Sequence, residues 1–437
     1  MGLDPVDRTA EDGRLRAAGR VLPFRTPAKT APASSLLERY FAVRADTERL
    51  TAPLSPEDQQ IQSMPDASPA KWHRAHTTWF FETFVLMPSG AGYRPFDPAY
   101  GYLFNSYYEA VGPRHPRPAR GMLTRPSAAE ITCYRAHVDD WMARFLPDAD
   151  QAARDLVELG LQHEQQHQEL ILTDIKHALS LNPLRPAYDP HPSASAETAA
   201  CGPSIEVEGG IHAIGHDGRG FAFDNEGPLH EVLLRPFRIA PRPVTVGEYL
   251  AFIADGGYRR PELWLSEGWA TVQAQGWQAP GYWRHDEAGG WTAFTLHGDR
   301  PLAADEPVAH VSLFEAAAYA EWAGKRLPTE FEWEVAARCH GHPAAAEPAR
   351  FHPRAHADGF RQDVWEWTAS AYLPYPGFRA APGAVGEYNG KFMSSQMVLR
   401  GRSCATAPGH ERPTYRNFFP PGARWQFSGF RLAEDAQ

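Results

Sequence analysis

Residues 155–181 read DLVELGLQHEQQHQELILTDIKHALSL, and His163 and His167 are four residues apart within this stretch. Residues with that spacing lie on one face of an α-helix, so both imidazoles can reach a single ion. The two histidines continue a stripe that contains Leu156 and Leu170, which directs them into a helix bundle. Because burying unsatisfied imidazoles is costly and a metal satisfies them, the spacing predicts a metal site.

The string His163-Glu164-Gln165-Gln166-His167 also fits the His-Glu-x-x-His pattern of zinc peptidases, in which the Glu is the general base. Such an enzyme needs a third ligand. The residues that follow, Gln168-Glu169-Leu170, do not begin a His-x-x-Gly-x-x-His continuation. A zinc-dependent hydrolase therefore stays an alternative that rests on five residues of pattern.

A second predicted helix at 70–86 offers a further ligand. His76 shares a stripe with Trp72 and Trp79 that faces the core, whereas His73 is expected to lie off that stripe. Three neutral imidazoles with open coordination positions suit Fe(II), Zn or Cu. Spacing alone does not choose among these metals.

The first half of the chain has the periodicity of a helix bundle. Ser127 and Glu130 are spaced as a capping box at the start of one segment, and Asn182-Pro183 ends another. With one long irregular connection at about 87–126, this pattern predicts a four-helix bundle over residues 31–182. The four helical segments are expected at about 34–50, 70–86, 127–145 and 155–181.

The second half of the chain has a different composition and hydrophobic pattern. Residues 183–204 are rich in Pro, Ser and Ala and are predicted to form a linker. Of the 13 tryptophans, most lie after residue 204, among short β-like runs broken by Gly and Pro. Residues 205–437 are therefore predicted to form an irregular α+β domain, with helices at 312–324 and after Thr329. Residues 1–30 are expected to be a flexible arm.

Composition narrows the class of protein. The 437 residues have a net charge of -10 and no long basic run, which argues against nucleic acid as a partner. No apolar run is long enough to span a membrane, and the first 30 residues do not resemble a signal peptide. Four scattered cysteines favour a reduced, cytoplasmic setting, and a monomer is expected.

Two sets of motifs carry a family resemblance. Trp72-x-x-Ala75-His76 followed by the 163–167 string resembles the DinB-like bundle of hercynine sulfoxide synthases, which act in ergothioneine biosynthesis. The second half resembles their formylglycine-generating-enzyme-like domain, a variant of the C-type lectin fold. The strings that support it are Val244–Tyr249, Arg326–Glu334, Val364–Thr368, Val398–Gly401 and Gly429–Leu432.

This resemblance implies a multidomain α and α+β protein that uses Fe(II) and O2 to join a thiol to C2 of the hercynine imidazole. It also implies roles for individual residues. The metal ligands would be His76, His163 and His167, and the catalytic proton donor Tyr107 or Tyr108, with Tyr388 a weaker candidate. The residues expected to contact substrate are Gln166, Asn417, Phe418, Phe419, Arg117 and Arg120.

One departure from the family concerns the sulfur donor. Relatives that use gamma-glutamylcysteine carry Arg-Asn-Trp-Asp where this chain has Arg416-Asn417-Phe418-Phe419, and their Asp holds the donor's amino group. A phenylalanine cannot accept a hydrogen bond from an ammonium. The donor is therefore expected to be free cysteine, and a selenosugar, as used by the related selenoneine synthases, remains an alternative.

The second half also raises formylglycine generation as another class of activity. That chemistry needs two copper-binding cysteines in this domain, and Cys339 and Cys404 are the only candidates there. Cys404 lies just after Arg400-Gly401, Cys339 falls where no motif cysteine is expected, and both are more simply interpreted as core or surface thiols. The domain is therefore predicted to be a scaffold that closes over the bundle.

Overall fold

The computed structural model describes residues 35–90, 92–191, 202–286, 289–341, 349–355, 359–360 and 363–436. Leu36–Gln437 form one compact unit. The predicted arm at 1–30 lies outside the described residues. Within the described ranges, every helix is too short or too polar to cross a bilayer.

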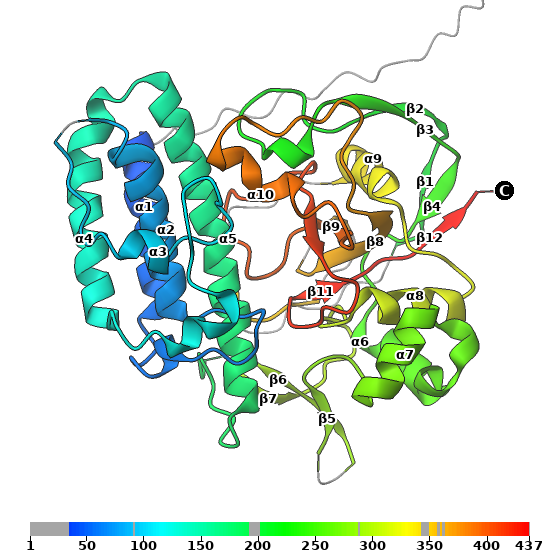
Figure 1. Ribbon diagram of the computed structural model, residues 1–437. Helices are drawn as coiled ribbons and strands as arrows, with labels where there is room; N and C mark the ends of the chain where they lie inside the picture. The colour runs from blue at the N-terminus through cyan, green and yellow to red at the C-terminus, as the bar shows by residue number, and fades with distance from the viewer. Residues whose placement is uncertain are drawn as a thin grey trace, which may run out of the picture. The chain divides into compact units, whose positions relative to one another are not determined.

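Four long helices run side by side in the first half of the chain (Figure 1). They are α1 (Leu36–Thr51), α2 (Ala70–Phe81), α4 (Ala128–Phe145) and α5 (Gln151–Leu181). The predicted capping box of Ser127 and Glu130 is present at α4. The Asp150 side chain caps α5, which therefore begins four residues before the predicted start.

Short helices fill the connections of the bundle. Helix α2 continues directly into a π-helical turn, η2 (Glu82–Leu86). The others are η1 (Asp58–Gln60), α3 (Tyr100–Leu103), η3 (Arg117–Met122) and η4 (Leu146–Asp148). The long connection between α2 and α4 thus carries α3 and η3, and it returns over the end of α2 that bears the histidines.

The second half is built from short strands in small sheets. The central sheet has the order β10-β9-β8-β11. It pairs β8 (Trp365–Ala371) with β9 (Met397–Gly401) in antiparallel fashion, and places β10 (Asn417–Phe419) and β11 (Ser428–Gly429) at its edges. The other strands are β1 (Ile205–Val207), β2 (Gly210–Ile214), β3 (His230–Leu234), β4 (Phe237–Ile239), β5 (Trp283–His285), β6 (Trp291–Thr295), β7 (Gly298–Pro301) and β12 (Ala433–Asp435).

Helices pack around these sheets. The predicted helices at 312–324 and after Thr329 are α8 (Leu313–Trp322) and α9 (Glu330–His340), and each begins with a capping box. Three others are α6 (Val246–Ala254), α7 (Ser266–Gln275) and α10 (Glu387–Gly390). The remaining 3-10 turns are η5 (Asp224–Glu226), η6 (Gly257–Arg259), η7 (Pro261–Leu263) and η8 (Ala384–Gly386).

The sequence motifs of this half meet as buried ion pairs. Arg431 pairs with Glu366 and Arg400 pairs with Glu334, and all four side chains are fully buried. A buried charge is tolerated where an opposite charge and hydrogen bonds satisfy it. These pairs connect β8 with the C-terminal segment and α9 with β9.

The two halves share a core. Tyr188 donates its hydroxyl to the Leu50 carbonyl of α1 (2.7 Å), and its backbone N–H donates to Leu296 of the second half (2.9 Å). Leu172 of α5 packs in one apolar cluster with Phe427. Residues 183–191 of the predicted linker therefore pack between the halves.

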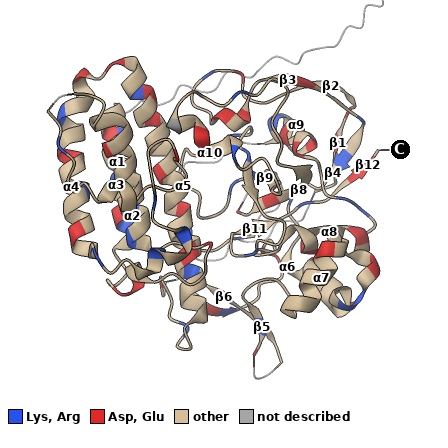
Figure 2. Cartoon of the chain, in the orientation of Figure 1, with Lys and Arg blue, Asp and Glu red and all other residues tan. Residues whose placement is uncertain are grey.

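Charged side chains of both signs are interleaved along the helices of the bundle, as Figure 2 shows for α1, α4 and α5. The acidic excess of the whole chain is 53 against 43 basic residues.

Candidate metal centre and substrate cavity

Three histidines converge inside the bundle. His76 comes from α2, and His163 and His167 come from successive turns of α5. One candidate ligand atom of each lies within 4.8 Å of the others. The three side chains are thus close enough to share an ion, as the spacing of the histidines predicts. They form the one cluster of potential metal ligands in the described ranges.

His76 is held in a fixed orientation. Its ring stacks between Trp72 (ring centroids 4.6 Å apart) and Trp79 (5.6 Å). Its Nδ1 lies 2.6 Å from the carbonyl oxygen of Phe104, which can only accept, so Nδ1 carries the proton. The bare nitrogen that a metal requires is then Nε2.

His167 is oriented by a second histidine. Its Nδ1 lies 2.7 Å from Nδ1 of His73, whose Nε2 lies 3.0 Å from the Asp174 carboxylate. Asp174 also accepts from the backbone N–H of Ser68 (2.8 Å). The prediction that His73 lies off the inward stripe was wrong: it is only 2 % exposed. Both ring nitrogens of His73 contact α5, at His167 and Asp174, so His73 faces α5 and is buried.

This chain of contacts fixes proton positions. The Asp174 carboxylate accepts the His73 Nε2 proton, so His73 Nδ1 is an acceptor. His167 then donates its own Nδ1 proton and keeps Nε2 bare. Carboxylate–histidine contacts of this kind commonly orient metal-bound imidazoles.

The three imidazoles are neutral at physiological pH. Burial lowers the pKa of His163 to about 4. Burial first, and the neighbouring histidines second, hold the pKa values of His76 and His167 well below their usual range. Nδ1 of His163 is buried and has no hydrogen-bond partner in the described part of the chain. Three neutral nitrogen ligands with open positions fit Fe(II) as well as Zn or Cu.

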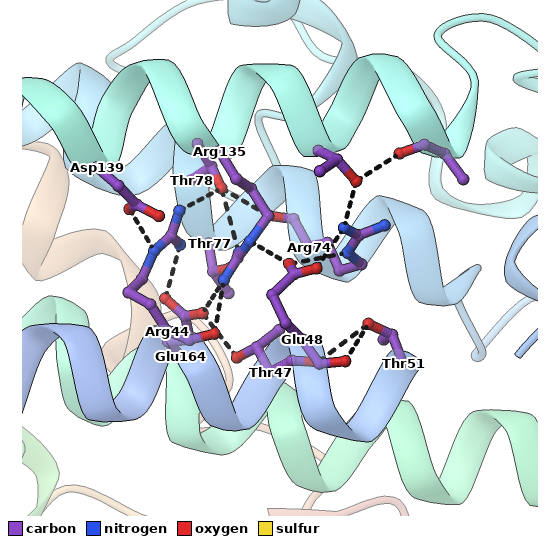
Figure 3. Close-up of polar contacts among 12 residues, drawn as sticks. Arg44, Thr47, Glu48, Thr51, Arg74, Thr77, Thr78, Arg135, Asp139 and Glu164 are labelled. Carbon is purple, nitrogen blue, oxygen red and sulfur yellow. Dashed lines mark hydrogen bonds and ion pairs between the residues drawn. The ribbon is translucent and has the colours of Figure 1, made fainter. Parts of the chain in front are cut away.

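Glu164 is not available as the base of a zinc hydrolase. Its side chain is fully buried and accepts from Arg44 (2.9 Å), Thr47 (2.7 Å) and Arg135 (2.9 Å), as Figure 3 shows. Burial alone would raise the pKa of Glu164, but Arg44 and Arg135 lower it to about 2. The carboxylate is therefore a permanent anion that joins α1, α4 and α5.

A cavity of about 340 Å³ opens over the three histidines. One wall is formed by α2, α5 and the long connection, and the other by residues of the second half. Glu169 of α5 joins the walls, because it accepts from Trp365 (2.6 Å), Ser403 (2.6 Å) and Thr406 (2.8 Å). The site is thus assembled by both halves.

Two arginines of η3 line this cavity. Arg120 lies over the Trp72 ring (3.3 Å) and donates to Ser68 (3.0 Å) and Ser106 (3.1 Å). Burial, with Arg117 second, lowers the pKa of Arg120 to about 9, so it remains charged at neutral pH. Among the described residues, no carboxylate lies within ion-pair distance of either arginine. Their charges are therefore free to meet an anionic ligand.

The predicted tyrosines differ in their contacts. Tyr107 lines the cavity, and its hydroxyl accepts from Arg117. Tyr108 is buried against Trp79 (5.7 Å) and Phe84 (5.1 Å), and no described group is hydrogen-bonded to its hydroxyl. Tyr388 lines the same cavity from α10, with its ring 6.0 Å from that of Tyr107. Burial raises the pKa of Tyr108 and Tyr388, so both hydroxyls keep their protons.

The predicted substrate contacts also lie on this cavity. Gln166 donates to the Tyr415 hydroxyl (2.6 Å), which turns its amide oxygen to the open space. Asn417, Phe418 and Phe419 form β10 at the opposite wall. Phe418 stacks on Tyr372 (4.2 Å), which fixes the plane of its ring.

Sequence reasoning missed several groups in the cavity wall. His410, Trp425 and Gln426 each have a buried polar atom without a hydrogen-bond partner in the described ranges: Nε2, Nε1 and Oε1. Unpaired buried polar atoms are costly, so such atoms beside a cavity indicate ligand contacts. These three residues lie on loops whose sequence has no periodicity. Only their closeness in sequence to the Arg416–Phe419 string could have identified them as cavity residues.

The cysteines do not form the pair that formylglycine generation requires. Cys404 is buried in the apolar core shared by the two halves, and Cys339 is exposed on α9. Neither lines the cavity. The lectin-like half therefore acts here as a wall of the histidine site.

Comparison with known proteins agrees with this division. The DinB superfamily pattern matches residues 39–171, and the pattern of the sulfatase-modifying factor enzyme 1-like domain matches residues 190–361 and 346–436. The chain is 28% identical over 314 residues to the formylglycine-generating enzyme of Streptomyces coelicolor, covering 57% of this chain and 95% of that protein.

Relatives of similar length match both halves together. The hercynine oxygenase of Mycolicibacterium smegmatis is 36% identical over 416 residues, covering 86% of this chain and 92% of that protein. The hercynine oxygenase of Mycobacterium tuberculosis is also 36% identical, over 412 residues. A DinB bundle joined to a sulfatase-modifying-type domain defines a class of oxygenases. Within it, the chain belongs to the hercynine oxygenase family.

Proposed function

We propose that the protein is an Fe(II)-dependent sulfoxide synthase that joins the sulfur of cysteine to C2 of the hercynine imidazole. The single observation that carries this proposal is the buried cluster of His76, His163 and His167 at the base of a cavity lined by unpaired cationic and aromatic side chains. Iron(II) held by His76, His163 and His167 would supply O2 activation and hold the donor sulfur.

The reaction balances with one O2. The imidazole C2–H and the thiol S–H bonds break, a C–S bond forms, one oxygen atom becomes the sulfoxide oxygen, and the other leaves as water. The residues of this chain bind and orient the reactants. The amide oxygen of Gln166 would accept from the imidazole N–H, and Phe418 would offer its ring to the trimethylammonium group.

The two arginines would bind the carboxylate of a substrate. Arg117 and Arg120 project from one helical turn and have no acidic partner among the described residues. A guanidinium pairs with a carboxylate in a bidentate geometry, which positions as well as attracts it. Asp66, beside Arg117 at the cavity, is the acidic group suited to the ammonium of a small donor such as cysteine.

Tyr108 is the favoured proton donor. The Tyr107 hydroxyl already accepts from Arg117, whereas that of Tyr108 is uncommitted in the described structure and faces the cavity near His163. Burial keeps Tyr108 protonated, which is the form that can give a proton to a reduced oxygen atom.

The test uses anaerobic enzyme loaded with Fe(II) and hercynine. Cysteine, gamma-glutamylcysteine or a selenosugar is added to separate samples, O2 is admitted, and the products are identified by mass spectrometry. We expect the cysteine sulfoxide product to form fastest. Loss of one charged contact at Phe419 would disfavour gamma-glutamylcysteine by about 10- to 150-fold.

A preference for gamma-glutamylcysteine would contradict the argument from Phe419. A preference for the selenosugar over both thiols would instead assign the protein to selenoneine synthesis, with the same metal centre. Absence of any O2-dependent product from hercynine would overturn the proposed function itself.

A further inference from the structure

A second cavity, of about 520 Å³, reaches the histidine cluster from another side. Its mouth lies between the first turns of α5 and the segments around Gly220 and Ala381. Its floor is formed by residues that also line the substrate cavity, among them Tyr108, His163 and Tyr388. The two cavities thus meet at one ligand of the metal centre.

The walls of this second cavity are mainly apolar. Phe80 of α2 and the α5 residues Leu156 and Leu159 form one side. Phe221, Phe223 and Val385 of the second half form the other. These apolar side chains offer dispersion contacts to an apolar molecule.

Apart from His163 and the hydroxyls of Tyr108 and Tyr388, the polar side chains of this lining contact other groups of the protein. Glu158 pairs with Arg39 (2.7 Å), and Asp224 accepts from Asn389 (2.6 Å). Gln166 donates to Tyr415 (2.6 Å), and Asp155 accepts from Gln151 (2.8 Å). Along the described lining, Nδ1 of His163 is the one buried polar atom without a partner, and His163 belongs to both cavities.

The substrate cavity differs in the cationic groups of its lining. Arg117 and Arg120 line it without a carboxylate partner in the described structure, and His410, Trp425 and Gln426 of its lining each have a buried polar atom without a hydrogen-bond partner there. Hercynine and an amino-acid donor would both occupy this space of about 340 Å³ over the histidines. A molecule that must arrive after them needs another path to the metal.

We propose that the second cavity is the passage by which O2 reaches the metal centre while the polar substrates occupy the first. This inference rests on the proposed function, because it assumes that O2 reacts at the three histidines. O2 is small, uncharged and apolar, so it needs none of the polar contacts that the second cavity lacks. The passage ends at His163 and Tyr108, beside the metal and the proposed proton donor.

Crystals of the iron-loaded enzyme under xenon pressure test the passage directly, because xenon occupies apolar cavities. We expect xenon within the second cavity, close to Leu156, Leu159 and Phe80. Absence of xenon from this cavity would overturn the proposal.

Leu159→Trp and Val385→Trp narrow the passage from its two sides, and Leu233→Trp on exposed β3 is the matched control. Nitric oxide binding to Fe(II) in the hercynine-bound enzyme serves as the kinetic probe. We expect binding to slow roughly tenfold in each passage variant, and KM for O2 to rise in parallel, with the control unchanged. Anaerobic affinity for hercynine should not change.

Rates equal to the parent in both passage variants would refute the passage. The nitric oxide measurement does not require turnover. Suppose that nitric oxide binding slows as expected but no product forms with any donor. The second cavity is then supported as the route to the metal, and the proposed sulfoxide synthase activity is rejected.

Discussion

At the scale of single residues, the metal centre depends on contacts that spacing could not reveal. Alanine at His76, His163 or His167 should abolish iron binding, because each removes one of three ligands. His73→Phe should retain iron but weaken its binding roughly 10- to 100-fold, because His167 loses the contact that fixes its tautomer.

Chelator competition measures this affinity, and the electron paramagnetic resonance signal of the Fe(II)–nitric oxide complex reports the ligand set. His137→Phe, on the α4 side of the bundle, is the control and should leave both unchanged. Parent-like affinity in His73→Phe would show that the Asp174–His73 contact does not orient His167. If one of the three alanine variants still binds one equivalent of iron, the histidine replaced in that variant is not a ligand.

Tyr108→Phe preserves size and packing but removes the proposed proton donor. Iron and hercynine should still bind, and the thiol should be oxidised directly by O2 to cysteine sulfinic acid. General acid catalysis is worth about 10²- to 10⁴-fold, so the sulfoxide product should fall by that order. Mass spectrometry of both products measures the ratio.

Tyr107→Phe should shift the ratio less, because its hydroxyl is bound by Arg117. The double variant covers the case in which the two tyrosines replace each other. An unchanged product ratio in the double variant would move the role to Tyr388, which lines the same cavity.

At the scale of elements, α5 carries a glycine that helix propensity alone would not choose. A Cβ at Gly160 would lie 2.5 Å from the Phe81 ring and 2.8 Å from the Phe80 ring. Gly160→Ala gains about 1 kcal/mol of helix propensity but forces two fully buried rings to move. We expect a net destabilisation of roughly 1–3 kcal/mol, measured by urea unfolding.

Gly101→Ala in α3 is the matched control, since a Cβ there has no neighbour within 4 Å. That variant should be as stable as the parent or slightly more so. A stabilised Gly160→Ala protein would show that the bundle accommodates the methyl group by a small shift.

The same helix carries a buried lysine. Burial lowers the pKa of Lys176 to about 7, and its amine contacts His310 rather than a carboxylate. The unfolded chain holds this proton up to a pKa of about 10.4. Between these values the unfolded state binds more protons, so the contribution of Lys176 to stability rises with pH.

Lys176→Met should therefore flatten the pH dependence of the free energy of unfolding between about pH 7 and pH 10. Urea titrations across this range, compared with those of the parent protein, give the difference. Identical slopes in the two proteins would mean that Lys176 remains charged in the folded state.

At the scale of the whole molecule, the halves should unfold together. Glu169 reaches from α5 to three groups of the second half, and Tyr188 bonds to both halves. Helical circular dichroism reports mainly the bundle, and tryptophan fluorescence mainly the second half. We expect the two signals to give coincident transitions in the parent.

In Glu169→Leu the transitions should separate, because Trp365, Ser403 and Thr406 lose their buried acceptor. Glu267→Leu, on the exposed face of α7, is the control and should keep them coincident. Coincident transitions in Glu169→Leu would show that the shared apolar core suffices to couple the halves.

Much of the fold was predictable, because hydrophobic periodicity and capping residues indicate helices in the sequence. The bundle helices, α8 and α9 lie close to the predicted positions. The convergence of His76 with the α5 pair followed from inward stripes. The role of His73 did not follow, since it depends on tertiary contacts with His167 and Asp174 of α5 that the period of α2 does not reveal. His410, Trp425 and Gln426 also come from irregular loops, where only tertiary packing brings side chains to the cavity.

The order of these parts along the chain has a consequence for synthesis. All three proposed metal ligands precede residue 168, whereas the second wall of the cavity comes from residues beyond 220. Amino-terminal domains generally fold first as a chain leaves the ribosome. A nascent bundle would therefore present its histidines to the solvent before their cover exists. We expect the choice of metal in the cell to depend on which ion is available during that interval.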